Sequence, residues 1–163
     1  MTQHTSYSHA RGFTLIELII TVTIVALLAG AAVPLAELAV KRTREQELQT
    51  ALRQIREGID AYKRAWDDKK IARSANESGY PKSLDQLVNG VPDITTANKT
   101  QIYFMRRIPR DPTYADAGVP AAATWGKRSY ASPPENPSEG ADVFDVYSLS
   151  ADVALNGVPY REW

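Results

Sequence analysis

A single carboxylate stands at the edge of a long apolar stretch near the N-terminus. Glu17 follows Phe13 by four residues, and the 19 residues Leu18–Ala36 carry no charge. As a helix this charge-free run is about 28 Å long, close to the thickness of a bilayer's hydrocarbon core. A carboxylate is costly to place in lipid, so Glu17 indicates a function. Arg11 and Gly12, just before Phe13, add a candidate processing site.

Simpler interpretations of this N-terminus remain open on the residues alone. A basic or polar start followed by an apolar run also describes a secretory signal peptide, and Ala29-Gly30-Ala31 fits its cleavage pattern. An uncleaved membrane anchor fits as well. The signal-peptide interpretation does not explain Glu17, unless its side chain simply reaches the membrane surface from near the helix end.

The composition favours a protein that is not an enzyme. The chain has no Cys, and its only histidines, His4 and His9, precede Gly12. From Gly12 onward it therefore lacks the usual nucleophile–base pairs and the usual zinc ligands. Lys and Arg together number 19, as do Asp and Glu, so no bulk charge attracts nucleic acid. We expect no nucleic-acid partner.

Beyond the charge-free run, apolar residues recur at helical spacing. Steps of 4, 3, 4, 3 and 4 separate Leu48, Leu52, Ile55, Ile59, Tyr62 and Trp66. This spacing predicts one apolar stripe on a helix that continues to about Trp66. The stripe is typical of packing on a sheet, and a partner-binding face is the alternative. Pro34 lacks a backbone donor, so the helix can kink or open near Gly30 and Pro34.

The rest of the sequence predicts a small α+β domain. Ser83 and Gln86 are expected to cap a short helix over Leu84–Val88. The clearest strands are Lys127–Ala131 and Val143–Leu149, which a turn-rich segment joins as a hairpin. Ile102–Met105 is a further strand or a helical turn. We expect about three strands, as a small antiparallel sheet packed on the C-terminal half of the long helix.

The run Gly12-Phe13-Thr14-Leu15-Ile16-Glu17 resembles the class III signal of type IV pilins and type II secretion pseudopilins. The resemblance implies that a prepilin peptidase cuts after Gly12 and that Phe13 is then N-methylated. Pro34 matches the helix-loosening proline of the family. The resemblance divides the chain into three parts: a leader (1–12), a transmembrane and assembly helix (13–40) and a periplasmic pilin-like domain (41–163).

The same resemblance implies how the subunits assemble. The new amine of Phe13 and the carboxylate of Glu17 are opposite charges in an apolar setting, so pairing between neighbouring copies would set their axial register. The implied partners are prepilin peptidase, an inner-membrane assembly platform, minor pseudopilins and further copies in a helical filament. The implied location is the bacterial inner membrane, with a single pass and the C-terminal domain in the periplasm.

The second half resembles the major, G-type pseudopilin of type II secretion. The matching segments are Tyr80-Pro81, Ile108-Pro109, Asp111-Pro112, Trp125-Gly126, the run from Phe144 to Asp152, and Trp163. In that family Asp-Pro and Trp-Gly usually run together. Here Thr113–Thr124 separates them, an apparent insertion of 12 residues.

A calcium site is the one metal site that the resemblance suggests. The carbonyl of Leu149 and the carboxylate of Asp152 match two family ligand positions. Calcium takes six to eight oxygens, normally with several carboxylates. After Asp152 the next acid is Glu162, so we expect no calcium. Instead, packing of Tyr160 and Trp163 is expected to hold the loop.

The sequence thus predicts a structural subunit of a type II secretion pseudopilus. It would be processed at Gly12, methylated at Phe13 and polymerised through its N-terminal helix to drive protein export. A type IV pilin for adhesion, motility or DNA uptake is the alternative. An uncleaved, membrane-anchored periplasmic binding domain is another.

Overall fold

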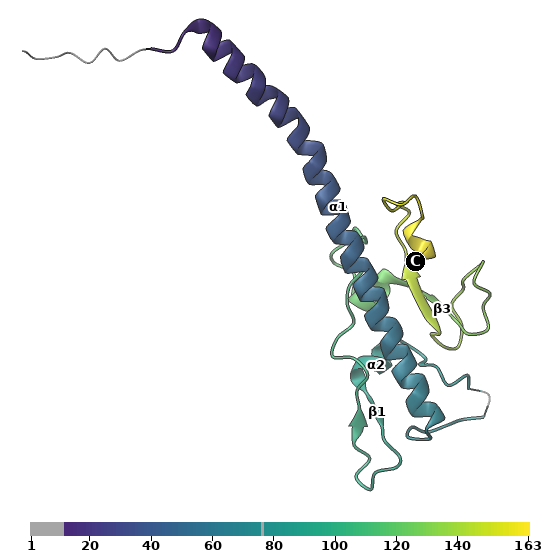
Figure 1. Cartoon of the computed structure of the whole chain (residues 1–163). Helices are drawn as coiled ribbons and strands as arrows, with labels where there is room; N and C mark the ends of the chain where they lie inside the picture. Colours follow the sequence, from purple (N-terminus) through teal and green to yellow (C-terminus); the bar gives the residue numbers. More distant parts are fainter. Residues whose placement is uncertain (1–11, 76) are drawn as a thin grey trace, which may run out of the picture. The chain divides into compact units, whose positions relative to one another are not determined.

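The computed structural model describes residues 12–75 and 77–163. Along the described chain one long helix precedes a second helix and four short strands. Figure 1 shows the course of the chain, with α1, α2, β1 and β3 labelled. The elements are α1 (Leu15–Asp67), α2 (Asp85–Asn89), β1 (Val91–Pro92), β2 (Gln101–Ile102), the 3₁₀ turn η1 (Ala121–Thr124), β3 (Trp125–Arg128), β4 (Asp145–Ser148) and the 3₁₀ turn η2 (Tyr160–Glu162). The α+β class expected from the sequence, a long apolar helix with small antiparallel sheets, is confirmed.

The chain separates into two compact units, Met1–Val40 and Lys41–Trp163. In the first unit every residue of 12–40 whose side chain is described is exposed. Helix α1 continues through Pro34 without a break. Pro34 has no N–H to donate to the carbonyl of Gly30, yet the residues on both sides of it are helical.

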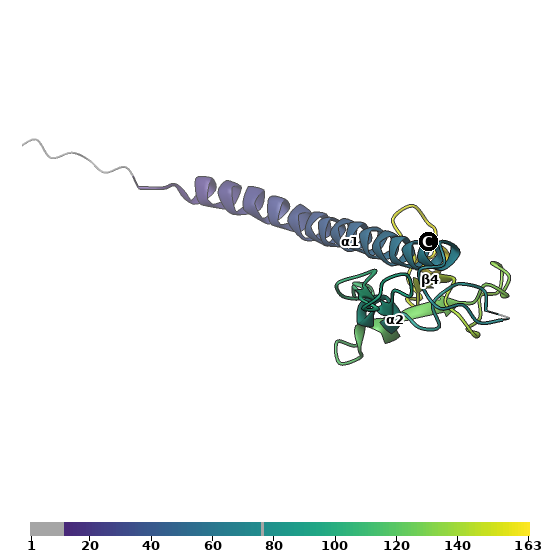
Figure 2. The ribbon, with the colours of Figure 1, turned by 90° about the horizontal axis from the view of Figure 1, so that it is seen from below.

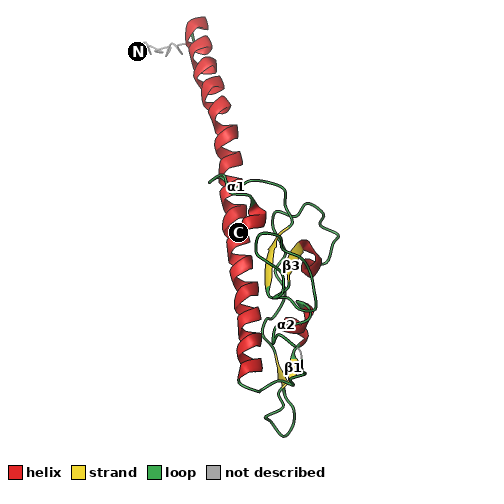
Figure 3. Ribbon diagram, turned by 90° about the vertical axis from the view of Figure 1, so that its right-hand side faces the viewer, coloured by secondary structure: helices red, strands yellow, loops and turns green. Residues whose placement is uncertain are grey.

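The second unit has its core on the predicted stripe of α1. Leu48, Leu52, Ile55 and Ile59 are buried, and Tyr62 packs at the edge of the cluster. They meet apolar residues of the other elements, among them Leu84, Leu87, Trp125, Val146 and Tyr160. Figures 2 and 3 show α2 and the strands on one side of this part of α1. The prediction that the stripe is a packing face is confirmed for these residues.

The predicted hairpin is confirmed as the pair β3–β4. Its antiparallel register places Trp125 opposite Ser148 and Arg128 opposite Asp145. β3 ends before the expected Ala131, because Ser132 N–H turns back to donate to the carbonyl of Ser129 at 3.0 Å.

The expectation of one sheet of about three strands is wrong for the described residues. They form two separate two-stranded sheets, β1–β2 and β3–β4. Strand β1 is only two residues long and ends at Pro92, which cannot donate to a further ladder. The strand expected at Ile102–Met105 is limited to Gln101–Ile102, since the N–H groups of Phe104 and Met105 both donate to the carbonyl of Leu87.

The short helix α2 is confirmed, one residue later than expected, but its expected cap is wrong. Leu84 is the N-cap residue, and no side chain caps the helix there. Gln86 does reach back, because its Oε1 accepts the N–H of Lys82 at 2.7 Å. Ser83 contributes its backbone carbonyl, which accepts the N–H of Gln86 at 3.2 Å.

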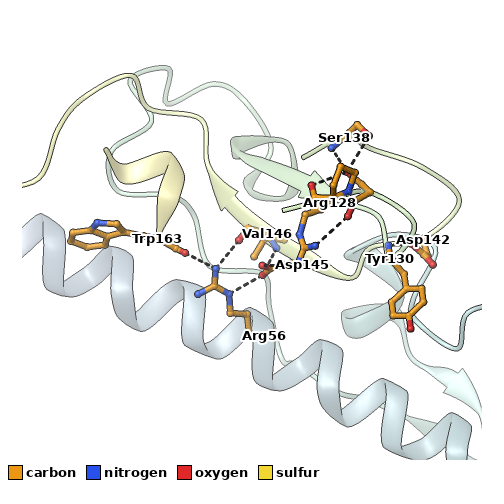
Figure 4. A network of polar contacts seen from close by, with 10 residues as sticks. Arg56, Arg128, Tyr130, Ser138, Asp142, Asp145, Val146 and Trp163 are labelled. Atoms are coloured by element: carbon orange, nitrogen blue, oxygen red, sulfur yellow. Dashed lines mark hydrogen bonds and ion pairs between the residues drawn. The ribbon is translucent and has the colours of Figure 1, made fainter. Parts of the chain in front are cut away.

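Arg56 ties the polar flank of α1 to the C-terminal elements, as Figure 4 shows. Its Nε donates to Asp145 Oδ1 at 2.8 Å, and its Nη2 donates to the backbone oxygens of Val146 (3.2 Å) and Trp163 (2.6 Å). Arg128 approaches the other oxygen of Asp145 at 3.7 Å. One guanidinium therefore fixes both β4 and the segment after η2 against the helix.

Asp142 organises the loop between β3 and β4. It accepts hydrogen bonds from the hydroxyls of Ser78 and Ser129 and from the N–H of Tyr130. Burial works against ionisation of the carboxyl, but these bonds outweigh it and hold the pKa of Asp142 below its ordinary value. The loop is thereby tied to the segment after α1.

The segment Thr113–Thr124, interpreted above as an insertion, is anchored by Asp111, whose side chain is fully buried. Its Oδ1 accepts the N–H of Thr113 at 2.7 Å, and its Oδ2 accepts the hydroxyl of Ser148 at 2.6 Å. Arg110 donates to the carbonyls of Val119 and Asp116 inside this segment. The segment Thr113–Thr124 therefore begins from the core beside β4.

We predict that Ile55→Ala destabilises the C-terminal unit by about 2–5 kcal/mol, because Ile55 is fully buried on α1 and the lost side chain leaves a cavity. Chemical unfolding of the detergent-solubilised protein, followed by circular dichroism, measures this change. Arg53→Ala, at an exposed position two residues away, is the matched control and should change stability by less than about 0.5 kcal/mol. Equal effects of the two changes would contradict the assigned core.

Candidate processing and assembly site

The candidate site lies where α1 begins. Gly12 and Phe13 precede the helix in irregular backbone, and the Phe13 side chain is 80% exposed. Apart from Gly12 itself and its two chain neighbours, no heavy atom lies within 4 Å of where a Cβ of Gly12 would stand. The peptide bond between them is thus open to an enzyme. The rest of the predicted leader lies outside the described residues.

Thr14 is the N-terminal cap of α1. Its Oγ1 accepts the N–H of Glu17 at 3.3 Å, and its carbonyl accepts the N–H of Leu18 at 3.1 Å. The Thr-x-x-Glu spacing is that of a capping box, a signal present in the sequence but missed above. It places Glu17 in the first turn, where the positive end of the helix dipole favours a carboxylate.

The helix after Glu17 is suited to an apolar surrounding. It is long and apolar enough to cross a membrane, and none of its most apolar 18-residue window is buried. The hydroxyls of Thr21 and Thr23 donate to the carbonyls of Leu18 (2.9 Å) and Ile19 (2.7 Å). These polar groups therefore need no water, which is the requirement for a helix in lipid.

A family model for the prokaryotic N-terminal methylation motif matches residues 7–33. The chain has a type IV pilin-like N-terminus. This pilin-like motif implies processing by prepilin peptidase and assembly into a filament, and with the apolar helix it fits a membrane-anchored protein. It does not distinguish a secretion pseudopilus from a pilus. No curated protein and no solved structure matches the chain.

The residues considered for calcium lie on the loop before η2. Leu149 and Asp152 are both exposed, and the Asp152 backbone carbonyl accepts the N–H of Tyr160 at 3.2 Å. Within residues 12–75 and 77–163 no three acidic, His or Cys side chains gather to hold a metal. The expectation of no calcium stays a prediction.

Glu45 of α1 holds this loop, a role that the sequence analysis missed. One oxygen, Glu45 Oε1, accepts both the Leu155 N–H at 2.8 Å and the Tyr160 hydroxyl at 3.0 Å. Lys41 donates to the carbonyl of Val153 at 2.7 Å. The expected packing of Tyr160 and Trp163 is confirmed, since Tyr160 is buried and the two rings meet edge to face at 5.2 Å.

Burial and then the hydrogen bond to the Glu45 carboxylate raise the pKa of Tyr160 to about 12. A neutral Tyr160 therefore stabilises the fold fully below pH 10, the ordinary tyrosine value, and this contribution is lost as the pH rises towards about 12. We predict that Tyr160→Phe lowers the melting temperature at pH 8, and that its deficit relative to wild type shrinks above pH 10. A deficit that is constant from neutral to strongly alkaline pH would contradict this assignment.

We also predict that Thr14→Ala weakens the first turn of α1 by about 1 kcal/mol, because the Glu17 N–H loses its acceptor. Hydrogen exchange of the Glu17 amide in detergent micelles should be faster in this variant. Thr14→Ser keeps the hydroxyl and should exchange at the wild-type rate. Identical protection in all three proteins would show that Thr14 is no cap.

Proposed function

We propose that the chain is a structural subunit of a type II secretion pseudopilus, cleaved after Gly12, methylated at Phe13 and polymerised through its N-terminal helix. The observation that carries the proposal is the methylation motif, which overlaps the exposed, apolar first part of helix α1. An exposed face of this size must be covered by lipid or by other copies. When a subunit moves from the membrane into a filament, contacts of this helix with lipid are replaced by contacts with neighbouring copies.

Glu17 is the group that makes the exchange specific. It occupies the first turn of α1, four residues after the amine that cleavage would create at Phe13. In a neighbouring copy that amine is the natural partner for the carboxylate, because either charge alone is costly in an apolar environment. The pair would fix the axial register between copies more than it would add net stability.

The pseudopilus is favoured over a pilus by the C-terminal half. Two pairs of the residues that resemble the G-type pseudopilin are hydrogen-bonded to each other, since Trp125 Nε1 donates to the carbonyl of Pro109 at 2.8 Å and the Ser148 hydroxyl donates to Asp111. Glu17 favours a shaft subunit over a tip subunit, which characteristically lacks the acid. A type IV pilin remains the second candidate, since the motif fits both.

We also propose partners and a location for the subunit. Prepilin peptidase, an inner-membrane assembly platform and minor pseudopilins would be its partners, and the unit from Lys41 onward would lie in the periplasm. The protein would act without a cofactor and without catalysis of its own. Its action would be mechanical, because the growing filament would drive export.

We predict that intact-mass analysis of the membrane-extracted protein shows a chain beginning at N-methylated Phe13. In cells without prepilin peptidase the full chain beginning at Met1 should accumulate instead. Gly12→Val, which places a β-branched side chain at the cleavage site, should likewise leave the chain uncleaved, with a full-length mass raised only by the substitution. A mature chain that begins at Met1 in all cells, or near Ala32, would sink the filament proposal.

Deletion of the gene separates the two filament types. Loss of exported proteins from the culture medium with unchanged twitching motility supports the pseudopilus. Loss of motility, adhesion or DNA uptake with normal secretion would assign the chain to a pilus instead.

A further inference from the structure

The loop between β4 and η2 carries an unusual group of exposed aliphatic side chains. Leu149, Val153, Leu155 and Val158 are 47, 44, 41 and 37% exposed. The loop is the yellow segment next to the C-terminal end in Figure 1. Only three other large apolar side chains of the second unit, those of Ile94, Tyr103 and Tyr130, are comparably exposed among the described residues. We call the four aliphatic residues the aliphatic loop patch.

The loop is held at the beginning of the second unit. Lys41, which binds the carbonyl of Val153, is the first residue of that unit and directly follows Val40 in α1. Glu45, one turn later, binds the N–H of Leu155. The aliphatic loop patch is therefore attached to the residues of α1 that come straight after the apolar segment.

Helix geometry sets the distance along α1 from the charge-free run to this attachment. Lys41 lies five residues after Ala36, which is about 7.5 Å at 1.5 Å per residue. The headgroup region of one leaflet is about 5–8 Å thick. If Leu18–Ala36 fills the hydrocarbon core, the short distance along the chain keeps Lys41 within reach of the lipid headgroups.

Several backbone N–H groups of the loop form hydrogen bonds within the protein, so the loop can enter a surrounding with little water. Val153 and Pro159 form a β-bridge, and Ala154 N–H donates to the carbonyl of Val158 at 2.9 Å. Gly157 N–H donates to the carbonyl of Ala154 at 3.0 Å, and Glu45 takes the N–H of Leu155. These N–H groups already have acceptors within the protein. Moving the turn out of water therefore leaves few polar groups without a hydrogen-bond partner.

We propose that the aliphatic loop patch is a membrane-contact surface, which inserts into the boundary between headgroups and acyl chains of the leaflet where α1 emerges. The exposed side chains of Arg42 and Arg44 flank the attachment and can reach lipid phosphates. The exposed carboxylates of Asp152 and Glu162 oppose this attraction. Apolar insertion, rather than charge, is therefore the main source of the contact. The inference rests on membrane anchoring by α1, as proposed above.

The absence of native cysteine makes a direct test possible, because each introduced thiol is unique. Leu155→Cys, labelled with an environment-sensitive fluorophore, is placed as the full chain in lipid nanodiscs with one copy per disc. The lipid is phosphatidylcholine with phosphatidylglycerol. A fraction carries a spin label near the headgroup in one set of discs and deep in the acyl chains in another. Ile94→Cys, similarly exposed but in the β1–β2 connection, is the matched control. Val25→Cys, in the apolar segment, reports anchoring itself.

We expect shallow spin labels to quench the Leu155 probe several-fold more than the Ile94 probe, and discs of phosphatidylcholine alone to give the same result. Equal quenching at both positions, with Val25 quenched by deep labels, would overturn the membrane contact while leaving anchoring intact. An unquenched Val25 probe would instead overturn the anchoring on which both proposals rest. Protection of Leu155 that requires two copies per disc would identify a second copy as the partner and refute lipid insertion. Loss of quenching without phosphatidylglycerol would contradict apolar insertion.

Discussion

The structure depends on one constraint, the exposed apolar surface of the first part of α1. From Phe13 to Val40 the described side chains are exposed, yet the charge-free run alone is long enough to cross a bilayer. In water this surface would drive aggregation, because apolar area removed from water is worth roughly 25 cal/mol per Å². Lipid and neighbouring helices are the two surroundings that relieve it. The hydroxyls of Thr21 and Thr23, closed on backbone carbonyls, are compatible with both.

The second unit meets a different requirement, a stable core from very little sheet. Two-stranded sheets are marginal alone, so the strands depend on the stripe of α1 that they cover. Three polar anchors connect segments distant in sequence: Arg56 to β4 and Trp163, Glu45 to the C-terminal loop, and Asp111 to Ser148. Each is a charged group bonded to several partners, so removing a partner leaves it unsatisfied and costs more than the bond itself contributes.

Periodic and local features were predictable from the sequence, whereas long-range polar contacts were not. The spacing of Leu48, Leu52, Ile55 and Ile59 identified the core face of α1, and the turn-rich segment between the two predicted strands identified the hairpin. The Thr14 cap had a local signal that was overlooked. No pattern distinguishes Glu45 or Arg56 from the other charged residues of α1, because their partners lie about 90 to 115 residues away. Glu45 accepts from an N–H and a hydroxyl, and Arg56 donates to a carboxylate and to backbone oxygens. The strands form two separate sheets because β1 ends at Pro92 and because the N–H groups of Phe104 and Met105 donate to the carbonyl of Leu87. Strand propensity does not predict either feature.

Filament formation by charge variants of the apolar segment tests the central claim most directly. Cells that overproduce the wild-type chain with its assembly machinery should yield filaments, counted by electron microscopy of sheared cell material. Glu17→Gln should abolish them while leaving the membrane-bound amount unchanged, because the carboxylate that would pair with the Phe13 amine is lost. Glu37→Gln, an exposed acid near the other end of the same segment, should assemble like wild type. Normal filaments from Glu17→Gln, or equal loss from both variants, would contradict the account.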